Sequence, residues 1–267
     1  MKKQTFKCRT APVCWRQFTR KRNAAFLSLG KEIHICTLSA ATLLFAVPKS
    51  AQAQVVTNTG NNADESKVKT EMAEISVLEE GDLLFNVANT QDGLTGAITN
   101  VTQGYAQERI SHVAIVCHQP NGVFALEASL EDGVRLNPID SFIQNAEHSA
   151  DGSPLILVGR LKDQSQASSS VKKALTYLGR PYDYLYSSTE DEIYCSELVQ
   201  ISYQNSDGSY IFAQQPMSFH DNTGQITPYW IEHYAKRGLT VPEGEPGTNP
   251  GGISQSDAIT IYKFKQE

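Results

Sequence analysis

The sequence predicts an α+β fold in which a mostly antiparallel sheet is packed by a few helices. The clearest evidence is residues 110–129, "ISHVAIVCHQPNGVFALEAS", where two strand-forming runs flank the turn tripeptide Pro120-Asn121-Gly122. Two later segments, 168–183 and 191–208, place apolar side chains at helical spacing. Shorter apolar runs elsewhere supply the remaining strands of the predicted sheet.

The other elements follow from local patterns and turn residues. In chain order, we expect a strand at residues 79–87 and a short helix or loop at 93–103. A strand that turns into a short helix should follow at 133–143, and a further strand at 154–161. Gly179 should close the first long helix and Pro181 should stop it. Asp207-Gly208 should end the second. Residues 228–264 are expected to form one short helix, a Pro/Gly loop and a last strand.

Residues 1–53 have the features of a secretory signal peptide with a long basic region. After that region comes the apolar run Cys36 to Val47, which is shorter than the ~20 residues that cross a bilayer. Ala51 and Ala53 occupy the positions that a signal peptidase recognises. We therefore expect cleavage near Ala53 and a periplasmic or secreted protein. Residues 54–72 would be a flexible leader, and residues 73–267 would be the folded domain.

The charge of the expected mature chain restricts its ligands. Residues 54–267 hold 28 acidic and 13 basic side chains, a net charge of −15. This argues against nucleic acid or anionic lipid as the main ligand and is compatible with small or cationic substrates. The mature part has no apolar run long enough for stable membrane insertion. Without an H-E-x-x-H motif or paired cysteines, the sequence predicts neither a metal nor a cofactor.

Cys195 lies at the predicted start of a helix, in "EIYCSELV". The positive end of a helix favours a cysteine thiolate, and its free backbone N–H groups can hold an oxyanion. Cys195 is therefore a candidate nucleophile. Two other interpretations stay open, because buried cysteines are common at helix starts and an oxidising compartment permits a disulfide with Cys117.

His112 and Glu127 are the candidate base and its carboxylate partner. If Pro120 and Asn121 form the tip of the hairpin, Glu127 faces Ala114 and lies diagonally from His112 on one face of the sheet. A carboxylate in an otherwise apolar strand is hard to explain by packing, whereas holding an imidazole in the right tautomer would explain it. A shift of one residue in the turn would move Glu127 to the opposite face.

The same hairpin bears on the disulfide alternative. Cys117 alternates to the face opposite His112 and lies five residues further along, roughly 17 Å at ~3.3 Å per residue. A disulfide needs Cα atoms within about 7 Å of each other. Cys195 therefore cannot easily lie beside His112 and also be bonded to Cys117.

Five motifs in order, "EEGDLLF", "SHVAIV", "LEAS", "YLGRPYDYLY" and "YCSELV", resemble the YiiX/YaeF group of permuted papain-like enzymes in the NlpC-type cysteine peptidase superfamily. The late segment "VPEGEPGTNPGGISQSDAI" is also similar, so the resemblance covers roughly residues 75–262. It implies a circularly permuted papain-like fold in which the histidine strand precedes the cysteine helix. It also implies that Cys195 is the nucleophile, His112 the base, Glu127 the third polar member, and Tyr182 of "GRPYD" an aid to the oxyanion. Cys117 and the long basic region depart from the family pattern.

Together these observations predict an exported cysteine hydrolase that cleaves an amide bond through a thioester. Its substrate would be a cell-wall peptide, another small peptide, an amino-acid amide or a lipid amide. The apolar segment 93–103 could line an acyl pocket or belong to the core. Two alternatives stay open: an acyltransferase that uses the same thioester, and a non-catalytic binding domain with a Cys117–Cys195 disulfide.

Overall fold

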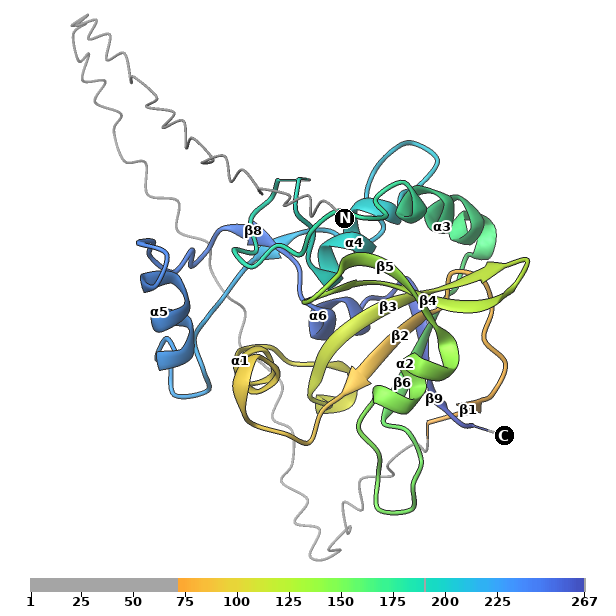
Figure 1. Cartoon of the computed structure of the whole chain (residues 1–267), viewed down its shortest axis with the longest axis horizontal. Helices are drawn as coiled ribbons and strands as arrows, with labels where there is room; N and C mark the ends of the chain where they lie inside the picture. Colours follow the sequence, from red (N-terminus) through yellow and green to blue (C-terminus); the bar gives the residue numbers. More distant parts are fainter. Residues whose placement is uncertain (1–71, 190, 267) are drawn as a thin grey trace, which may run out of the picture. The chain divides into compact units, whose positions relative to one another are not determined.

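The computed structural model describes residues 72–189 and 191–266, and Figure 1 shows their arrangement. The predicted signal peptide lies outside the described residues. So does the predicted leader except for its last residue, Met72, which packs against the main core. None of the helices in the described part of the chain combines the length and hydropathy needed to cross a bilayer.

A seven-stranded sheet forms the centre of the described fold, with the strand order β1-β9-β6-β2-β3-β4-β5. Its strands are β1 (Glu74–Ile75), β2 (Leu83–Val87), β3 (Ile110–Gln119), β4 (Gly122–Ser129), β5 (Gly133–Pro138), β6 (Ile156–Leu161) and β9 (Ile259–Phe264). All neighbouring pairs are antiparallel except β1 and β9, which run parallel. A separate two-stranded sheet pairs β7 (Gln215–Pro216) with β8 (Pro246–Gly247). The predicted mostly antiparallel α+β architecture is confirmed.

The β3–β4 hairpin has the predicted register. Ile115 faces Leu126 and Gln119 faces Gly122, so the two residues left at the tip are Pro120 and Asn121. Continuing this register toward the open end of the hairpin puts His112 diagonally from Glu127 on one face. The turn residues were sufficient to predict the pairing because a hairpin is a local structure whose register depends on its loop length.

The helices are α1 (Gly93–Val101), α2 (Ile139–Asn145), α3 (Ala167–Leu175), α4 (Cys195–Ser202), α5 (Pro228–Ala235) and α6 (Pro250–Ser254). The segment predicted as a helix or loop is thus the helix α1. A helix also begins within the predicted Pro/Gly loop, because the Asn249 side chain accepts a bond from Gly252 N at 2.6 Å and Pro250 takes the first helical position.

The predicted end of α4 at Asp207-Gly208 is wrong, since the helix ends at Ser202. Asp207 Oδ1 accepts bonds from the backbone N and the hydroxyl of Ser209, at 2.9 and 2.6 Å. This local turn closes an isolated antiparallel bridge between Gln204 and Tyr210. The Asp-Gly pair therefore marks the tip of a tight turn that follows the helix.

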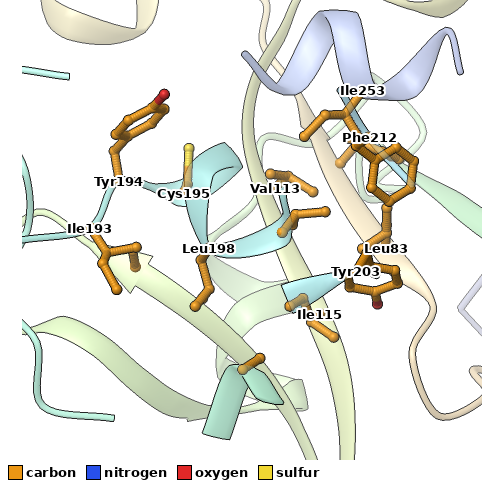
Figure 2. Close-up of a cluster of buried hydrophobic side chains, with 14 of the residues drawn as sticks. Leu83, Val113, Ile115, Ile193, Tyr194, Cys195, Leu198, Tyr203, Phe212 and Ile253 are labelled. Atoms are coloured by element: carbon orange, nitrogen blue, oxygen red, sulfur yellow. The ribbon is translucent and has the colours of Figure 1, made fainter. Parts of the chain in front are cut away.

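Two cores cover the two faces of the sheet. The smaller core packs α2 against residues such as Ala114 and Val116, whereas the main core contains buried residues of α1, α3, α4, α5 and α6. Figure 2 shows part of the main core, with Cys195 at the beginning of α4 and Leu198 one turn further along. Leu198 is fully buried, which stabilises the fold by about 2–3 kcal/mol and fixes the first turn of α4 on the sheet.

Candidate active site

Cys195 is the first residue of α4, as the sequence predicts. Tyr194 precedes it in an extended conformation and donates its backbone N–H to the Glu197 carboxylate at 3.3 Å. The first N–H groups of a helix have no partner within the helix and carry the positive end of its dipole. The thiol is therefore located where a negative charge on sulfur, and on an oxygen near it, is stabilised.

His112 connects Cys195 to Glu127. Its Nε2 lies 2.8 Å from Glu127 Oε2, and a second side-chain hydrogen bond joins the ring to Cys195. A carboxylate oxygen can only accept, so Nε2 carries a hydrogen and Nδ1 is left for the sulfur. The structure thus brings together the three side chains that the sequence indicated, from β3, β4 and the start of α4.

The pKa of His112 is raised to about 10. Burial by itself would lower this pKa, but the hydrogen bonds to Cys195 and Glu127, and the negative charges of both partners, outweigh it. The ring is therefore an imidazolium at neutral pH. Burial raises the pKa of Glu127, but His112 and then Arg135 bring it below its usual range, so this carboxyl stays ionised.

Two side chains of β5 hold the other oxygen of Glu127. Arg135 Nε and Asn137 Nδ2 both donate to Glu127 Oε1 at 3.0 Å, which leaves Oε2 for His112. Neither residue was singled out from the sequence. The sequence nevertheless allowed the Arg135–Glu127 pair to be found, because a short turn joins β4 to β5 and places Arg135 directly opposite Glu127.

Tyr182 is located beside Cys195 by a turn that is attached to the start of β5. Val134 N donates to Arg180 O at 2.8 Å, and Gly179 N donates to Val134 O at 2.8 Å. Gly133 permits this contact, because it has a φ of +67° and a Cβ there would lie 2.0 Å from Arg180 O. No side chain other than that of glycine fits at this position.

The Tyr182 hydroxyl is a hydrogen-bond donor throughout the ordinary pH range. The pKa of Tyr182 is raised well above its usual value, first by burial and then by the negative charge of Cys195. The next residue, Asp183, is buried and accepts bonds from the backbone N of Leu185 and Ser187 at 2.7 and 2.6 Å. Asp183, which sequence reasoning missed, thereby orders the loop that follows Tyr182.

Two cavities meet at Cys195, and both are lined by Ile98, Tyr182 and Cys195. The larger has a volume of about 440 Å³, and its wall includes the charged side chains of His112, Glu127, Glu131, Arg135 and Glu147. The smaller has a volume of about 60 Å³, and aromatic rings dominate its wall, from Tyr182, Tyr186, Tyr194, Phe219 and Trp230. The site therefore has a polar side and an aromatic side.

Segment 93–103 contributes both to the core and to the site. Ala97 of α1 is buried in the main core. Leu94 lines the larger cavity, Val101 lines the smaller one, and Ile98 lines both. The segment therefore belongs to the core on one face of α1 and lines the two cavities with other residues, while an acyl pocket stays a prediction.

The two cysteines of the described chain, Cys117 and Cys195, are both free. Burial raises the pKa of Cys117, and its sulfur accepts a bond from Gln119 Nε2 at 3.0 Å. Cys117 is thus a neutral core thiol, whereas the Cys195 thiol lies beside the His112 ring. The structure therefore does not contain the Cys117–Cys195 disulfide of the alternative interpretation.

In chemical terms, the arrangement offers a thiol beside a cationic imidazole, a carboxylate that orients this imidazole, and donors for an oxyanion. These are the parts that nucleophilic acyl transfer requires. With a histidine strand that precedes the cysteine helix, the fold is that of a permuted papain-like protein.

Comparison with known proteins identifies the family. Residues 77–261 match the model of the permuted papain-like amidase enzymes, YaeF/YiiX, the C92 peptidase family. The chain belongs to this family. It is 24% identical over 183 residues to the uncharacterized protein YiiX of Escherichia coli strain K12, a match that covers 68% of this chain and 84% of that protein.

A solved structure supports the same fold. The crystal structure of yiiX from Escherichia coli O157:H7, described as a metalloprotein, matches with a TM-score of 0.56 and 23% identity. The match covers 71% of this chain and 98% of the other. Within residues 72–189 and 191–266, no group of three or more His, Cys, Asp or Glu side chains is arranged to hold a metal ion. Glu127 already bonds to His112, Arg135 and Asn137, so the residues at the site do not fit a metal centre.

Proposed function

We propose that the protein is an exported cysteine amidase that hydrolyses an N-acyl amide through a Cys195–His112–Glu127 triad. The observation that carries this proposal is the double hydrogen bonding of His112, to Cys195 on one side and to Glu127 on the other. Export is proposed from the signal-like residues 1–53, and would place the enzyme in the periplasm or outside the cell.

The proposed reaction begins from the thiolate and imidazolium pair. The Cys195 sulfur attacks the amide carbonyl, and the backbone N–H of Cys195 and the Tyr182 hydroxyl hold the oxyanion. His112 gives its proton to the leaving nitrogen as the carbon–nitrogen bond breaks, which leaves a thioester. A water molecule then attacks the thioester while His112 takes its proton. The thiolate leaves, and a carboxylic acid is released.

The two cavities suggest how the substrate lies. The proton donor must reach the leaving nitrogen, and His112 lines the larger, charged cavity but not the aromatic one. The amine half of the substrate is therefore assigned to the larger cavity and the acyl half to the aromatic cavity. This division favours an apolar acyl group on a polar amine, such as an N-acyl amino acid or an N-acyl amine, over a cell-wall peptide.

A product assay tests the proposal. The protein is incubated with N-acyl amides that carry amino acids or peptides as the amine half, and the released amine and carboxylic acid are measured. Equal release of both supports hydrolysis, whereas appearance of the acyl group on an added acceptor amine would instead show acyl transfer. Absence of a Cys195 thioester by mass spectrometry, together with no amine release from any substrate, would contradict the proposal.

Glu127→Gln is expected to shift the pH dependence of the reaction. The hydrogen bond and charge of Glu127 raise the pKa of His112, whose protonated form gives the proton to the leaving amine. In the wild type, kcat/KM should therefore fall as pH rises through about 10. In the variant this fall should occur at lower pH. At pH values below the fall, kcat/KM of the variant should be about 10²-fold lower than that of the wild type.

Asp132→Asn provides the control for this pH profile. Asp132 is exposed and also pairs with Arg135, at 2.5 Å, but it does not contact His112. Its variant should keep the alkaline fall near that of the wild type. If kcat/KM fell over the same alkaline pH range in Glu127→Gln and in the wild type, this would show that Glu127 does not tune the pKa of His112.

A further inference from the structure

The aromatic cavity beside Cys195 shares lining residues with a second cavity that has both apolar and polar walls. This outer cavity has a volume of about 310 Å³ and is lined in part by Leu185, Tyr234 and Leu239. Among the described residues, only Tyr186 and Met217 line both the aromatic cavity and the outer cavity. These two side chains therefore form the partition between the two cavities.

Tyr186 is the fixed half of the partition. Its ring is buried and packs edge-on against Tyr194 and Trp230, with centroid distances of 5.3 and 5.5 Å. Its backbone lies within the loop that the buried Asp183 carboxylate orders through Leu185 N. Moving Tyr186 would disturb both ring contacts and the loop.

Met217 is the movable half of the partition. Its backbone is held next to the β7–β8 sheet, by bonds of 2.8 Å from Met217 N to Glu245 O and from Gly244 N to Met217 O. Its unbranched side chain has three rotatable bonds and adapts to the space around it. The thioether fills room that Gly247 leaves free, since a Cβ at Gly247 would lie 2.4 Å from the Met217 sulfur.

The size of the aromatic cavity limits what it can hold while Met217 stays in place. Its 60 Å³ corresponds to only about four to six water-sized positions, at ~10–15 Å³ each. A short acyl group attached to Cys195 fits this space. A longer chain can reach the outer cavity when the Met217 side chain is displaced, because Met217 lines both cavities.

We propose that Met217 sets the length of the acyl group that Cys195 accepts, so that the wild type prefers short acyl chains and loss of the Met217 side chain admits long ones. The inference rests on the proposed function, because it takes Cys195 as the acylated atom. It goes further by assigning chain-length selection to one side chain that does not take part in the chemistry.

The test measures acylation of Cys195 by p-nitrophenyl esters of acetic, hexanoic and decanoic acid, at concentrations below those at which the esters aggregate. Nitrophenolate release gives the rate, and mass spectrometry identifies the acyl-enzyme. The wild type should react with the acetyl ester at least about 10-fold faster than with the decanoyl ester. In Met217→Ala the ratio of decanoyl to acetyl rates should rise by about 10-fold or more.

Two controls and a second variant make the test specific. Met217→Leu, which is similar in volume, should keep the wild-type ratio. Ile231→Ala removes an exposed apolar side chain that lines neither cavity, and it should also leave the ratio unchanged. Met217→Val shortens the partition less severely, and should raise the ratio in the same direction if Met217→Ala does not fold.

The possible failures are distinguishable. If the wild type forms the acetyl-enzyme but the ratio is the same in Met217→Ala, Met217→Val and the wild type, the assignment of Met217 is overturned while the proposed function stands. Equal acetyl and decanoyl rates in the wild type would overturn it as well. If no ester acylates Cys195 in the folded wild type, the proposed function fails, and the inference fails with it.

Discussion

Cys195→Ala is expected to abolish amide hydrolysis, lowering kcat by about 10⁴-fold or more. The sulfur is the only protein atom that joins the acyl group covalently in the proposed mechanism, so its loss removes the thioester route as a whole. The rate of amine release from an N-acyl amide measures the effect. Intact-protein mass spectrometry on the same samples should show no acyl adduct.

The other described cysteine supplies the matched control for this experiment. Cys117 is buried in the main core, and its sulfur bonds to Gln119 rather than to the site. Cys117→Ala should therefore lose some stability through a small cavity but keep its kcat. Full activity in Cys195→Ala would exclude Cys195 as the nucleophile. Equal losses in the two variants would indicate a structural effect.

His112→Ala is expected to lower kcat by about 10²–10⁴-fold. The substitution removes both the cation that pairs with the Cys195 thiolate and the proton donor for the leaving amine. It also leaves Glu127 bonded only to Arg135 and Asn137. Because His112 lines the 440 Å³ cavity, imidazole added to the solution should enter and restore part of the rate. Rates are measured with and without imidazole.

His118→Ala is the control for the histidine experiment. His118 lies on the same strand as His112 but is exposed. Its variant should hydrolyse the amide at the wild-type rate and show no response to imidazole. An undiminished rate in His112→Ala would rule out His112 as the acid and base of the reaction.

The hairpin and its diagonal pair could be predicted because they depend on local sequence. A two-residue tip fixes the β3–β4 register, and the register puts His112 and Glu127 on one face. The start of α4 at Cys195 also followed from its local pattern. Its place at a helix start made Cys195 a candidate nucleophile, whereas the role of Tyr182 rested mainly on the family resemblance, because no local pattern brings Tyr182 to His112.

Other features depend on contacts between distant segments, which periodicity does not encode. The attachment of Tyr182 to β5 requires Gly133, whose neighbour in space is Arg180. The aromatic cavity combines α1, the loop after Tyr182, and residues of the C-terminal part such as Met217 and Trp230. The alternation of side chains along β3 was also insufficient to separate the two cysteines, since Cys117 and Cys195 belong to the same core cluster. What distinguishes them is the partner that each sulfur has.

The most direct test of the account is the alkylation of Cys195 by iodoacetamide near pH 6, with and without His112, followed by peptide mass spectrometry. In the proposed mechanism, the His112 imidazolium stabilises negative charge on the Cys195 sulfur and so makes it more reactive. The account therefore predicts fast labelling of Cys195 in the wild type without reductant, little labelling of buried Cys117, and at least about 10-fold slower labelling of Cys195 in His112→Ala. Equal labelling rates in the two proteins, or a Cys195 that reacts only after reduction, would contradict the proposed thiolate and imidazolium pair.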